Sequence, residues 1–278
     1  MKTGIVRTAV LCASAAAGLT VWLIAPGHAS TEMKAPFMHR NFAHRGLHKR
    51  DKTVPENSLA AFRRAVKAGY GIELDVHITA DDQLAVFHDD NLKRITGVDR
   101  NIEDLTMAEL QQLRLCGTEE TIPTLRQALD VLGGKVPLIL EIKRGKRNTE
   151  LCQRVRSELF GYNGPVCIES FDPTIVRWWW KNAPDVLRGQ LAQPPKDYKK
   201  DASPAAAFLC GNLLTNFLCR PHFVAYRIAP KPFTVRLCDR MGAIRAAWTS
   251  KEWAHEKDYD IVIFERYKPG VWFRANIE

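Results

Sequence analysis

The sequence predicts an α/β fold: a distorted TIM-type (β/α)8 barrel, preceded by an N-terminal hydrophobic helix. Three observations lead to this prediction. From residue 41 onward, short apolar runs alternate with segments of helical periodicity, as in a parallel α/β sheet. Eight or nine of these runs are strand candidates, close to the number that closes a barrel. Polar residues gather at the ends of the first strands, where such barrels build their sites.

The composition is that of a globular protein, with 278 residues of which 46% are hydrophobic and 26% charged. A net charge of +9 favours anionic partners, either a phosphorylated substrate or acidic lipid. Nucleic acid is not an expected partner, because the sequence contains neither zinc-finger spacing nor a basic zipper. None of the seven cysteines forms a C-x-x-C pair, so no structural zinc is expected. Disulfides remain an alternative, slightly behind buried free thiols.

The N-terminal segment has the pattern of an export signal. Lys2 and Arg7 precede an uncharged, apolar run over residues 8–25. This length is near the lower limit for crossing a bilayer and just beyond a typical signal-peptide core. Residues 1–29 are therefore predicted to be a signal peptide or a membrane anchor, and residues 38–275 the barrel domain. Either reading places the barrel outside the cytoplasm, at the cell membrane or, as the second choice, secreted.

The individual elements follow from the periodicity in chain order. Strands are expected at residues 41–44, 71–77, 84–88, 136–142, 166–170, 186–191, 223–228, 243–248 and 261–264. Helices are expected at residues 59–68, with Ser58 as the cap, and at 106–115 and 124–132. The connection between the second and third strands is too short for a crossover helix, so we expect a distortion or a local hairpin there. A doubly wound sheet is the rival fold, but no glycine-rich loop follows the first strand.

Charged and polar side chains occupy the ends of the first four strands. They are His44 and Arg45 after the first, Glu73 and Asp75 late in the second, His88 and Asp89 after the third, and Glu141 and Lys143 at the fourth. The carboxyl ends of barrel strands converge on one rim, so these groups should meet. Burying an unpaired charge in a strand costs on the order of several kcal/mol. Two carboxylates on the same side of the second strand would offset that cost if a cation lies between them.

This combination suits phosphodiester chemistry. Three carboxylates without a thiolate favour one hard divalent cation, Mg2+ or Ca2+. Such a cation, with Arg45 and Lys143, would neutralise a phosphodiester and its transition state. The two histidines would exchange the roles of general base and general acid, because the leaving alkoxide is poor. Each feature alone is more often structural, so the prediction depends on their occurrence together on successive strand ends.

Several motifs together resemble the glycerophosphodiester phosphodiesterase family, barrels of the phospholipase C-like type. They are HRG at 44–46, PENS at 55–58, GIELDV at 71–76, VFHD at 86–89, IPTL at 122–125, EIK at 141–143, ESFDP at 169–173 and WT at 248–249. The resemblance implies that Glu73, Asp75 and Glu141 bind the divalent metal. It implies that His44 and His88 are the acid–base pair and that Arg45 and Lys143 hold phosphate. Asn57 would support the site with a hydrogen bond.

The activity implied by this resemblance is the metal-dependent hydrolysis of glycerophosphodiesters to glycerol 3-phosphate and an alcohol. In that family the glycerol hydroxyl beside the ester is thought to attack phosphorus, and water then opens the cyclic phosphate. Two alternatives stay open: a lysophospholipase D-like enzyme acting on membrane lysolipids, and a non-catalytic phosphodiester-binding barrel. A metal-dependent sugar isomerase would not need two histidines beside a phosphate clamp.

The chain departs from the family pattern at two places. The asparagine that often follows the late Trp-Thr is replaced by Ser250 and Lys251. The Thr-Asp that commonly ends the last strand is replaced by Phe264 and Glu265. We expect both positions at the far side of the rim, and therefore an effect on substrate preference rather than on the chemical core.

Overall fold

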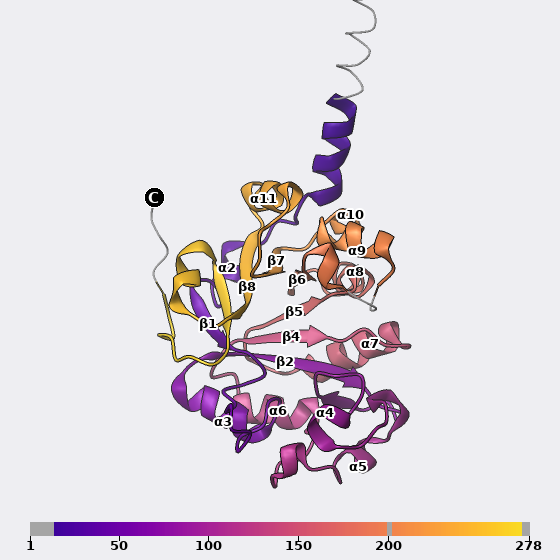
Figure 1. Cartoon of the computed structure of the whole chain (residues 1–278), viewed down its shortest axis with the longest axis vertical. Coiled ribbons are helices and arrows are strands. Elements are labelled where there is room, and N and C mark those ends of the chain that lie inside the picture. Colours follow the sequence, from indigo (N-terminus) through magenta and orange to yellow (C-terminus); the bar gives the residue numbers. More distant parts are fainter. Residues whose placement is uncertain (1–13, 199–201, 274–278) are drawn as a thin grey trace, which may run out of the picture.

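The computed structural model describes residues 14–198 and 202–273. Within these residues, eight parallel strands form a closed barrel, because β1 pairs in parallel with both β9 and β2. The strands are β1 (Arg40–Ala43), β2 (Gly71–Ile78), β4 (Leu138–Ile142), β5 (Val166–Ser170), β6 (Leu187–Ala192), β7 (Phe223–Arg227), β8 (Ile244–Ser250) and β9 (Ile261–Phe264). The predicted TIM-type barrel is confirmed, and Figure 1 shows its helices on the outside.

The remaining strand is part of a local hairpin. β3 (Leu84–Val86) pairs antiparallel with β2, which confirms the expected distortion. The third strand was predicted to end at His88, but β3 ends at Val86, so His88 lies two residues beyond it. His88 still reaches the rim, because β2 extends past Asp75 and the chain returns along it. The amide of Phe87 donates to the carbonyl of Asp75 over 3.1 Å. This bond places the next residue, His88, at the same height along the barrel as Asp75.

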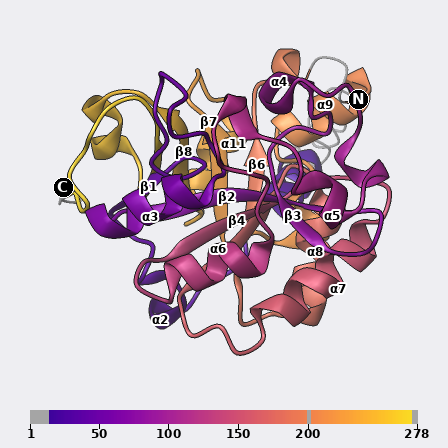
Figure 2. The ribbon, with the colours of Figure 1, turned by 90° about the horizontal axis from the view of Figure 1, so that it is seen from below.

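Polar side chains cap two of the outer helices, and the cap at Ser58 is the one predicted from the sequence. The Ser58 side chain accepts from the amide of Ala61 at the start of α3 (Leu59–Ala68). Thr124 forms a capping box at the start of α6 (Leu125–Leu132). Seen from below in Figure 2, α3 and α6 lie in front of the sheet. The other described helices are α2 (Thr31–Lys34), α4 (Lys93–Thr96), α5 (Met107–Leu110), α7 (Asn148–Leu159), α8 (Pro173–Asn182), α9 (Pro204–Gly211), α10 (Asn216–Cys219) and α11 (Phe233–Arg240).

The helix predicted over residues 106–115 is wrong in length. α5 ends after a single turn, and a 3-10 turn (Leu115–Gly117) follows. Cys116 in that turn has a φ of 53°, which no continuous helix allows. Leu110 and Leu115 instead pack into a small separate apolar cluster beside β3. Tertiary packing of residues 106–117 therefore outweighs the helical periodicity of their sequence.

Two apolar layers hold the barrel. One lies between the strands and the outer helices, and Trp179 is its largest fully buried side chain. The other fills the barrel interior and includes Phe42 and Phe223. A Cβ at Gly189 would lie 2.1 Å from the ring of Phe223, so only glycine leaves room for this ring. The interior is thus closed, and polar groups are left at one mouth.

The described part of the N-terminal segment is helical over residues 14–24 and projects from the barrel (Figure 1). In the part of the chain that the structure describes, no helix is long and apolar enough to cross a bilayer. The predicted apolar run begins at residue 8, so its first six residues, 8–13, lie outside the described residues. The six cysteines of the described ranges are free thiols, four of them buried.

Candidate active site

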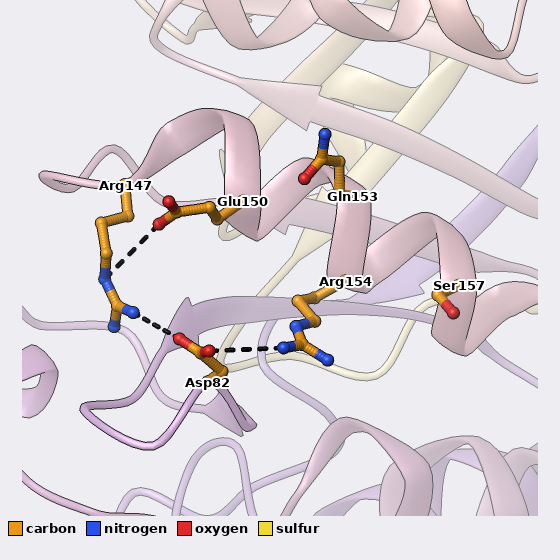
Figure 3. A pocket seen from close by; sticks show the side chains of 6 residues that line it. All are labelled: Asp82, Arg147, Glu150, Gln153, Arg154 and Ser157. Carbon is orange, nitrogen blue, oxygen red and sulfur yellow. Dashed lines mark hydrogen bonds and ion pairs between the residues drawn. The ribbon is translucent and has the colours of Figure 1, made fainter.

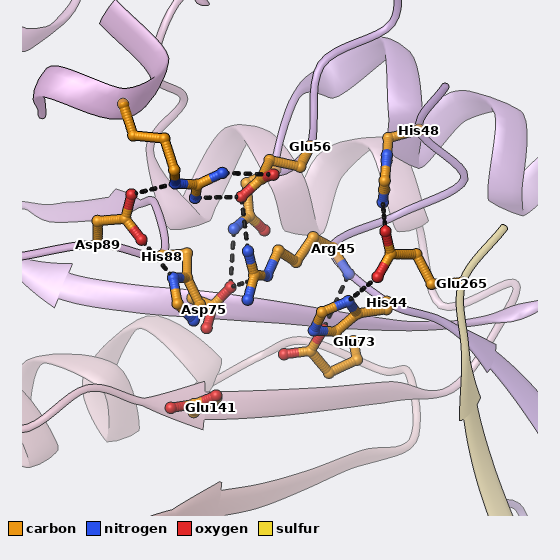
Figure 4. A network of polar contacts seen from close by, with 12 residues as sticks. His44, Arg45, His48, Glu56, Glu73, Asp75, His88, Asp89, Glu141 and Glu265 are labelled. Atoms are coloured by element: carbon orange, nitrogen blue, oxygen red, sulfur yellow. Dashed lines mark hydrogen bonds and ion pairs between the residues drawn. The ribbon is translucent and has the colours of Figure 1, made fainter. Parts of the chain in front are cut away.

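Three carboxylates meet at the mouth of the barrel, as the strand pattern predicts. Glu73 and Asp75 lie on β2, and Asp75 is the register partner of Glu141 on the neighbouring β4. One oxygen from each of the three lies within 4.8 Å of the others. All three are buried, at 2%, 0% and 8% exposure. Figure 4 shows them with the surrounding polar network.

These residues fit a divalent cation. Burial, together with the charges of Asp75 and Glu141, raises the pKa of Glu73 well above its usual value. Within the described ranges, Oδ1 of Asp75 accepts no hydrogen bond and has only an ion-pair contact, with Lys143 at 3.4 Å. Three buried hard oxygen donors in mutual repulsion are the ligand set of Mg2+ or Ca2+. The site is thus suited to one cation held by Glu73, Asp75 and Glu141.

Two positive side chains border the carboxylates. Nζ of Lys143 lies 2.7 Å from Oε1 of Glu141 and 3.4 Å from Oδ1 of Asp75. Burial alone would lower the pKa of Lys143, but Glu141 and Asp75 outweigh it and raise the pKa above its usual value. Nε of Arg45 lies 3.6 Å from Oδ2 of Asp75. Both cations therefore stay charged beside the acidic group, where a phosphate can reach them.

The loop after β1 is shaped around this group. Arg45 has a φ of 53° and Gly46 a φ of 77°, so the chain turns sharply at the rim. The turn aims the backbone amide of Arg45 at Oε2 of Glu73, over 2.9 Å. Nδ2 of Asn57, also at positive φ, donates to Oδ2 of Asp75 over 2.8 Å. Both bonds fix carboxylate oxygens in place.

Each histidine of the rim faces a carboxylate of its own. Nδ1 of His44 lies 3.6 Å from Oε2 of Glu265, and burial lowers the pKa of His44 to about 4. Nδ1 of His88 contacts Oδ1 of Asp89 at 2.6 Å, in a half-buried setting. The hydrogen bonds from His88 and Arg94 outweigh burial and lower the pKa of Asp89. Nδ1 of His88 is thus engaged by Asp89, and its Nε2 is left for the reaction. Nδ1 of His44 is buried beside Glu265 but makes no hydrogen bond within the described residues.

Several site residues were not assigned a role from the sequence. Arg94 bridges Asp89 and Glu56. Glu56 in turn accepts from Arg45 over 2.7 Å, and Figure 4 shows this pair. Glu169 on β5 is the buried register partner of Glu141, and burial raises its pKa well above the usual value. The PENS, VFHD and ESFDP motifs contain three of these residues, and that was the available signal.

Glu265 corrects the interpretation of the departures from the family pattern. It was expected across the rim from the chemical core, but it contacts His44. The physical reason is barrel closure: β9 pairs with β1, and the amide of His44 donates to the carbonyl of Phe264 over 3.1 Å. The residue after the last strand is therefore the neighbour of the residue after the first.

A second polar pocket lies away from these carboxylates, between α7 and the β2–β3 hairpin (Figure 3). Arg147 and Arg154 both pair with Asp82 there, and Arg147 also lies 3.9 Å from Oε2 of Glu150, so two positive charges face two negative ones. Its charges therefore neutralise one another, and it brings together no acid–base pair comparable to that of the rim.

Comparisons with known proteins agree with this geometry. The sequence model of the glycerophosphoryl diester phosphodiesterase family matches residues 44–268. The chain is 35% identical over 166 residues to "Glycerophosphodiester phosphodiesterase" of Caldanaerobacter subterraneus, covering 54% of this chain and 65% of that protein. It is 36% identical over 143 residues to human "Lysophospholipase D GDPD1", covering 47% and 44%. The matches thus span less than two thirds of these relatives.

Solved structures show the same fold. An Oleispira antarctica phosphodiesterase, in complex with the product sn-glycerol-3-phosphate, superposes with a TM-score of 0.67 at 24% identity, covering 82% of this chain and 93% of that one. The glycerophosphodiester phosphodiesterase of Thermotoga maritima gives a TM-score of 0.61 at 23% identity, covering 81% and 93%. With the family match extending over most of the barrel, the chain belongs to the glycerophosphoryl diester phosphodiesterase family.

Proposed function

We propose that this protein hydrolyses glycerophosphodiesters to glycerol 3-phosphate and an alcohol, with one divalent cation, Mg2+ or Ca2+. The observation that carries the proposal is a rim with three buried carboxylates within 4.8 Å of one another, between two histidines that each face a separate carboxylate. A purely structural acidic cluster would not need either histidine. The family membership supports the same chemistry.

Glu73, Asp75 and Glu141 would hold the cation. When bound, the cation supplies positive charge that offsets the negative charge growing on the phosphoryl oxygens. Arg45 and Lys143 border the same carboxylates and keep their own positive charge there. Their donors would bind the remaining phosphate oxygens and align the phosphorus for attack.

The two histidines would divide the proton work. Nε2 of His44 accepts the proton of the glycerol hydroxyl beside the ester while its oxygen forms a bond to phosphorus. The bond from phosphorus to the leaving alcohol breaks, and His88 donates the proton that this oxygen needs. A cyclic phosphate and a free alcohol result. Water then opens the ring, with the histidines in reversed roles, to give glycerol 3-phosphate.

The first experiment measures release of glycerol 3-phosphate from a panel of glycerophosphodiesters, with and without EDTA. We expect release that chelation abolishes and that Mg2+ or Ca2+ restores. No release from any diester would instead favour a non-catalytic phosphodiester-binding barrel. Equal release in excess EDTA would contradict the cation requirement.

The division of labour between the histidines has its own test. His88→Ala should lose about a hundred- to ten-thousand-fold in rate with an ordinary alcohol leaving group. It should lose far less with p-nitrophenolate, which departs without a proton. His44→Ala should be impaired with both, because His44 acts on the attacking hydroxyl. Equal losses of His88→Ala on the two substrates would reject these roles.

A lysophospholipase D-like activity is the second candidate. The matched human relative carries the name "Lysophospholipase D GDPD1", and large apolar side chains are exposed on the helix at residues 14–24 and on α9. Lysophosphatidylcholine in the same panel decides between the two. Faster release of choline from it than from glycerophosphocholine would favour the second candidate.

We further propose that residues 1–29 keep the protein at a membrane, with the barrel outside the cytoplasm. The charges of Lys2 and Arg7 before an apolar run support this orientation. Cell fractionation with protease protection tests it. Full-length protein found wholly in the cytoplasm would reject it, whereas a mature form that begins near Ser30 would favour secretion.

A further inference from the structure

Large apolar side chains are exposed around the point where the N-terminal helix leaves the barrel. Trp22 on that helix is 51% exposed, Phe208 on α9 is 56% exposed, and Phe233 at the start of α11 is 60% exposed. Leu19 and Leu209 extend the same set. Figure 1 shows α9, α10 and α11 grouped around the foot of the helix. We call these five side chains the apolar collar.

The foot of the helix is anchored firmly to the barrel. Ile24 is fully buried in a cluster that contains Val224, Tyr226 and Val235. Nδ2 of Asn216, on α10, donates to the carbonyl of Ile24 over 3.1 Å. The foot of the helix is therefore fixed to the barrel. A membrane or partner that contacts the helix also contacts the barrel surface beside it.

Contacts between the helices hold the segments that carry the collar next to one another. Nδ2 of Asn212 donates to the carbonyl of Phe208 over 2.9 Å. The hydroxyl of Thr234 contacts Oδ1 of the same asparagine at 3.3 Å, so the start of α11 lies against the end of α9. The ring of Trp22 lies 5.0 Å from the ring of Phe217 on α10. The three helices thus join the apolar surface of residues 14–24 to that of the barrel.

The charge of this region favours an anionic partner. Residues 204–240, which contain α9, α10 and α11, carry five basic residues against one acidic residue, Asp239. Arg220 lies 5.3 Å from the ring centre of Trp22 and donates to its carbonyl over 2.8 Å. Tryptophan and arginine side by side, bordered by apolar side chains, are typical of a surface that sits at lipid headgroups.

We propose that the apolar collar and its basic border dock the barrel itself onto an anionic phospholipid bilayer. This inference rests on the proposal that the N-terminal segment brings the chain to a membrane, and it adds a second, peripheral contact. The segment with α9 follows the carboxyl end of β6, the end of the barrel that carries the carboxylates, whereas α10 and Arg220 lead into the amino end of β7. Docking would therefore lay this flank of the barrel, between its two ends, against the lipid headgroups.

The test uses the full chain and vesicles of phosphatidylcholine with phosphatidylglycerol. The variant Phe208→Ser/Phe233→Ser should partition to these vesicles at least about tenfold more weakly than wild type, because two aromatic side chains no longer move from water into the bilayer. Phe160→Ser is the matched control, since Phe160 at the end of α7 is 90% exposed and outside the collar. The control should stay within about twofold of wild type.

Hydrolysis of a water-soluble diester, measured on the same proteins, separates the inference from the proposed function. Unchanged soluble activity with weakened partitioning supports docking. Failure of all proteins to hydrolyse the diester would reject the function, while the partition data would still decide the docking. Equal partitioning of wild type and double variant would overturn the inference, as would an equal loss in the Phe160→Ser control.

Two further measurements test whether something other than an anionic bilayer covers the apolar collar. Light scattering after size exclusion reports whether the double substitution dissociates an oligomer, in which case a second copy covers the collar and the inference is wrong. Vesicles of phosphatidylcholine alone should bind wild type more weakly than the mixed vesicles. Equal binding to both would overturn the anionic preference. Thermal unfolding confirms that each variant is folded.

Discussion

The substitution Glu73→Gln should stabilise the cation-free protein while it abolishes stabilisation by the cation. Two unit charges 4.8 Å apart repel by about 3 kcal/mol at an effective dielectric constant near 20. Glu73 faces both Asp75 and Glu141, and Arg45 offsets part of this repulsion. The raised pKa of Glu73 means that partial protonation relieves some of it as well. A net gain of about 1–3 kcal/mol remains.

This gain is measurable by thermal unfolding in EDTA. For a barrel of this size, each 1 kcal/mol shifts Tm by about 2–4 °C, so Glu73→Gln should unfold several degrees above wild type. Glutamine keeps an oxygen that can accept the backbone N–H of Arg45. With Mg2+ or Ca2+ at about a hundred times its Kd, wild type should gain about 2.7 kcal/mol and the variant almost nothing.

Glu119→Gln is the matched control, because the side chain of Glu119 is 94% exposed and pairs with Arg114 at 3.2 Å, away from the carboxylates of the rim. It should unfold within about 0.5 kcal/mol of wild type in both buffers. The reasoning is refuted if Glu73→Gln unfolds at or below wild type in EDTA while its fold is intact. A variant that gains as much from the cation as wild type would equally refute it.

Three further perturbations test other parts of the structure. Asp89→Asn should slow hydrolysis of an ordinary diester about ten- to a hundredfold but that of a p-nitrophenyl ester less, because Asp89 orients His88; equal losses would contradict this. Ion pairs outweigh burial and lower the pKa of Glu56 from 4.5 to about 2, so its stabilisation is present above pH 4.5 and is lost as pH falls toward 2. Glu56→Gln should flatten that part of an acid-unfolding curve. Gly189→Ala should lower the free energy of unfolding in a denaturant titration by about 1–3 kcal/mol, since its Cβ would collide with Phe223; an unchanged midpoint would contradict the packing.

The barrel and its carboxylate group could be predicted because they follow local periodicity. The alternation of apolar runs identified all eight barrel strands, with ends displaced by two residues at most. Glu73 and Asp75 share a face because side chains alternate along a strand. Glu141 joins them because β4 runs parallel to β2 in a register that places Glu141 beside Asp75. No long-range contact had to be known.

The features that the sequence did not reveal depend on contacts distant in the chain. The short connection predicted a distortion or a hairpin at the third strand, but it did not show how far β2 would extend before β3 turns back along it, and this length determines where His88 lies. The pairing of His44 with Glu265 arises only when the barrel closes, over 221 residues of separation (265 − 44). A charge placed after a last strand is thus informative only once the strand order is known.

The reach of Glu265, more than its charge, should determine how it acts on His44. Its backbone is fixed, because its amide donates to the carbonyl of Ser250 over 2.8 Å and β9 ends one residue earlier. The carboxylate already lies 3.6 Å from Nδ1 of His44, so it has no distance to spare. Glu265→Asp removes one methylene, roughly 1.5 Å of reach, and leaves the ring without its partner.

Glu265→Asp should therefore lower kcat about as much as the uncharged Glu265→Gln, roughly tenfold or more, on both alcohol and p-nitrophenyl leaving groups. KM should stay within about threefold, because neither variant removes a residue proposed to hold phosphate. Steady-state kinetics of the two variants on both substrates measure this. Phe264→Leu, which keeps the carboxylate and changes only the preceding residue, serves as control and should retain most of kcat. If Glu265→Asp keeps wild-type kcat while Glu265→Gln loses it, charge alone suffices and the argument from reach is wrong.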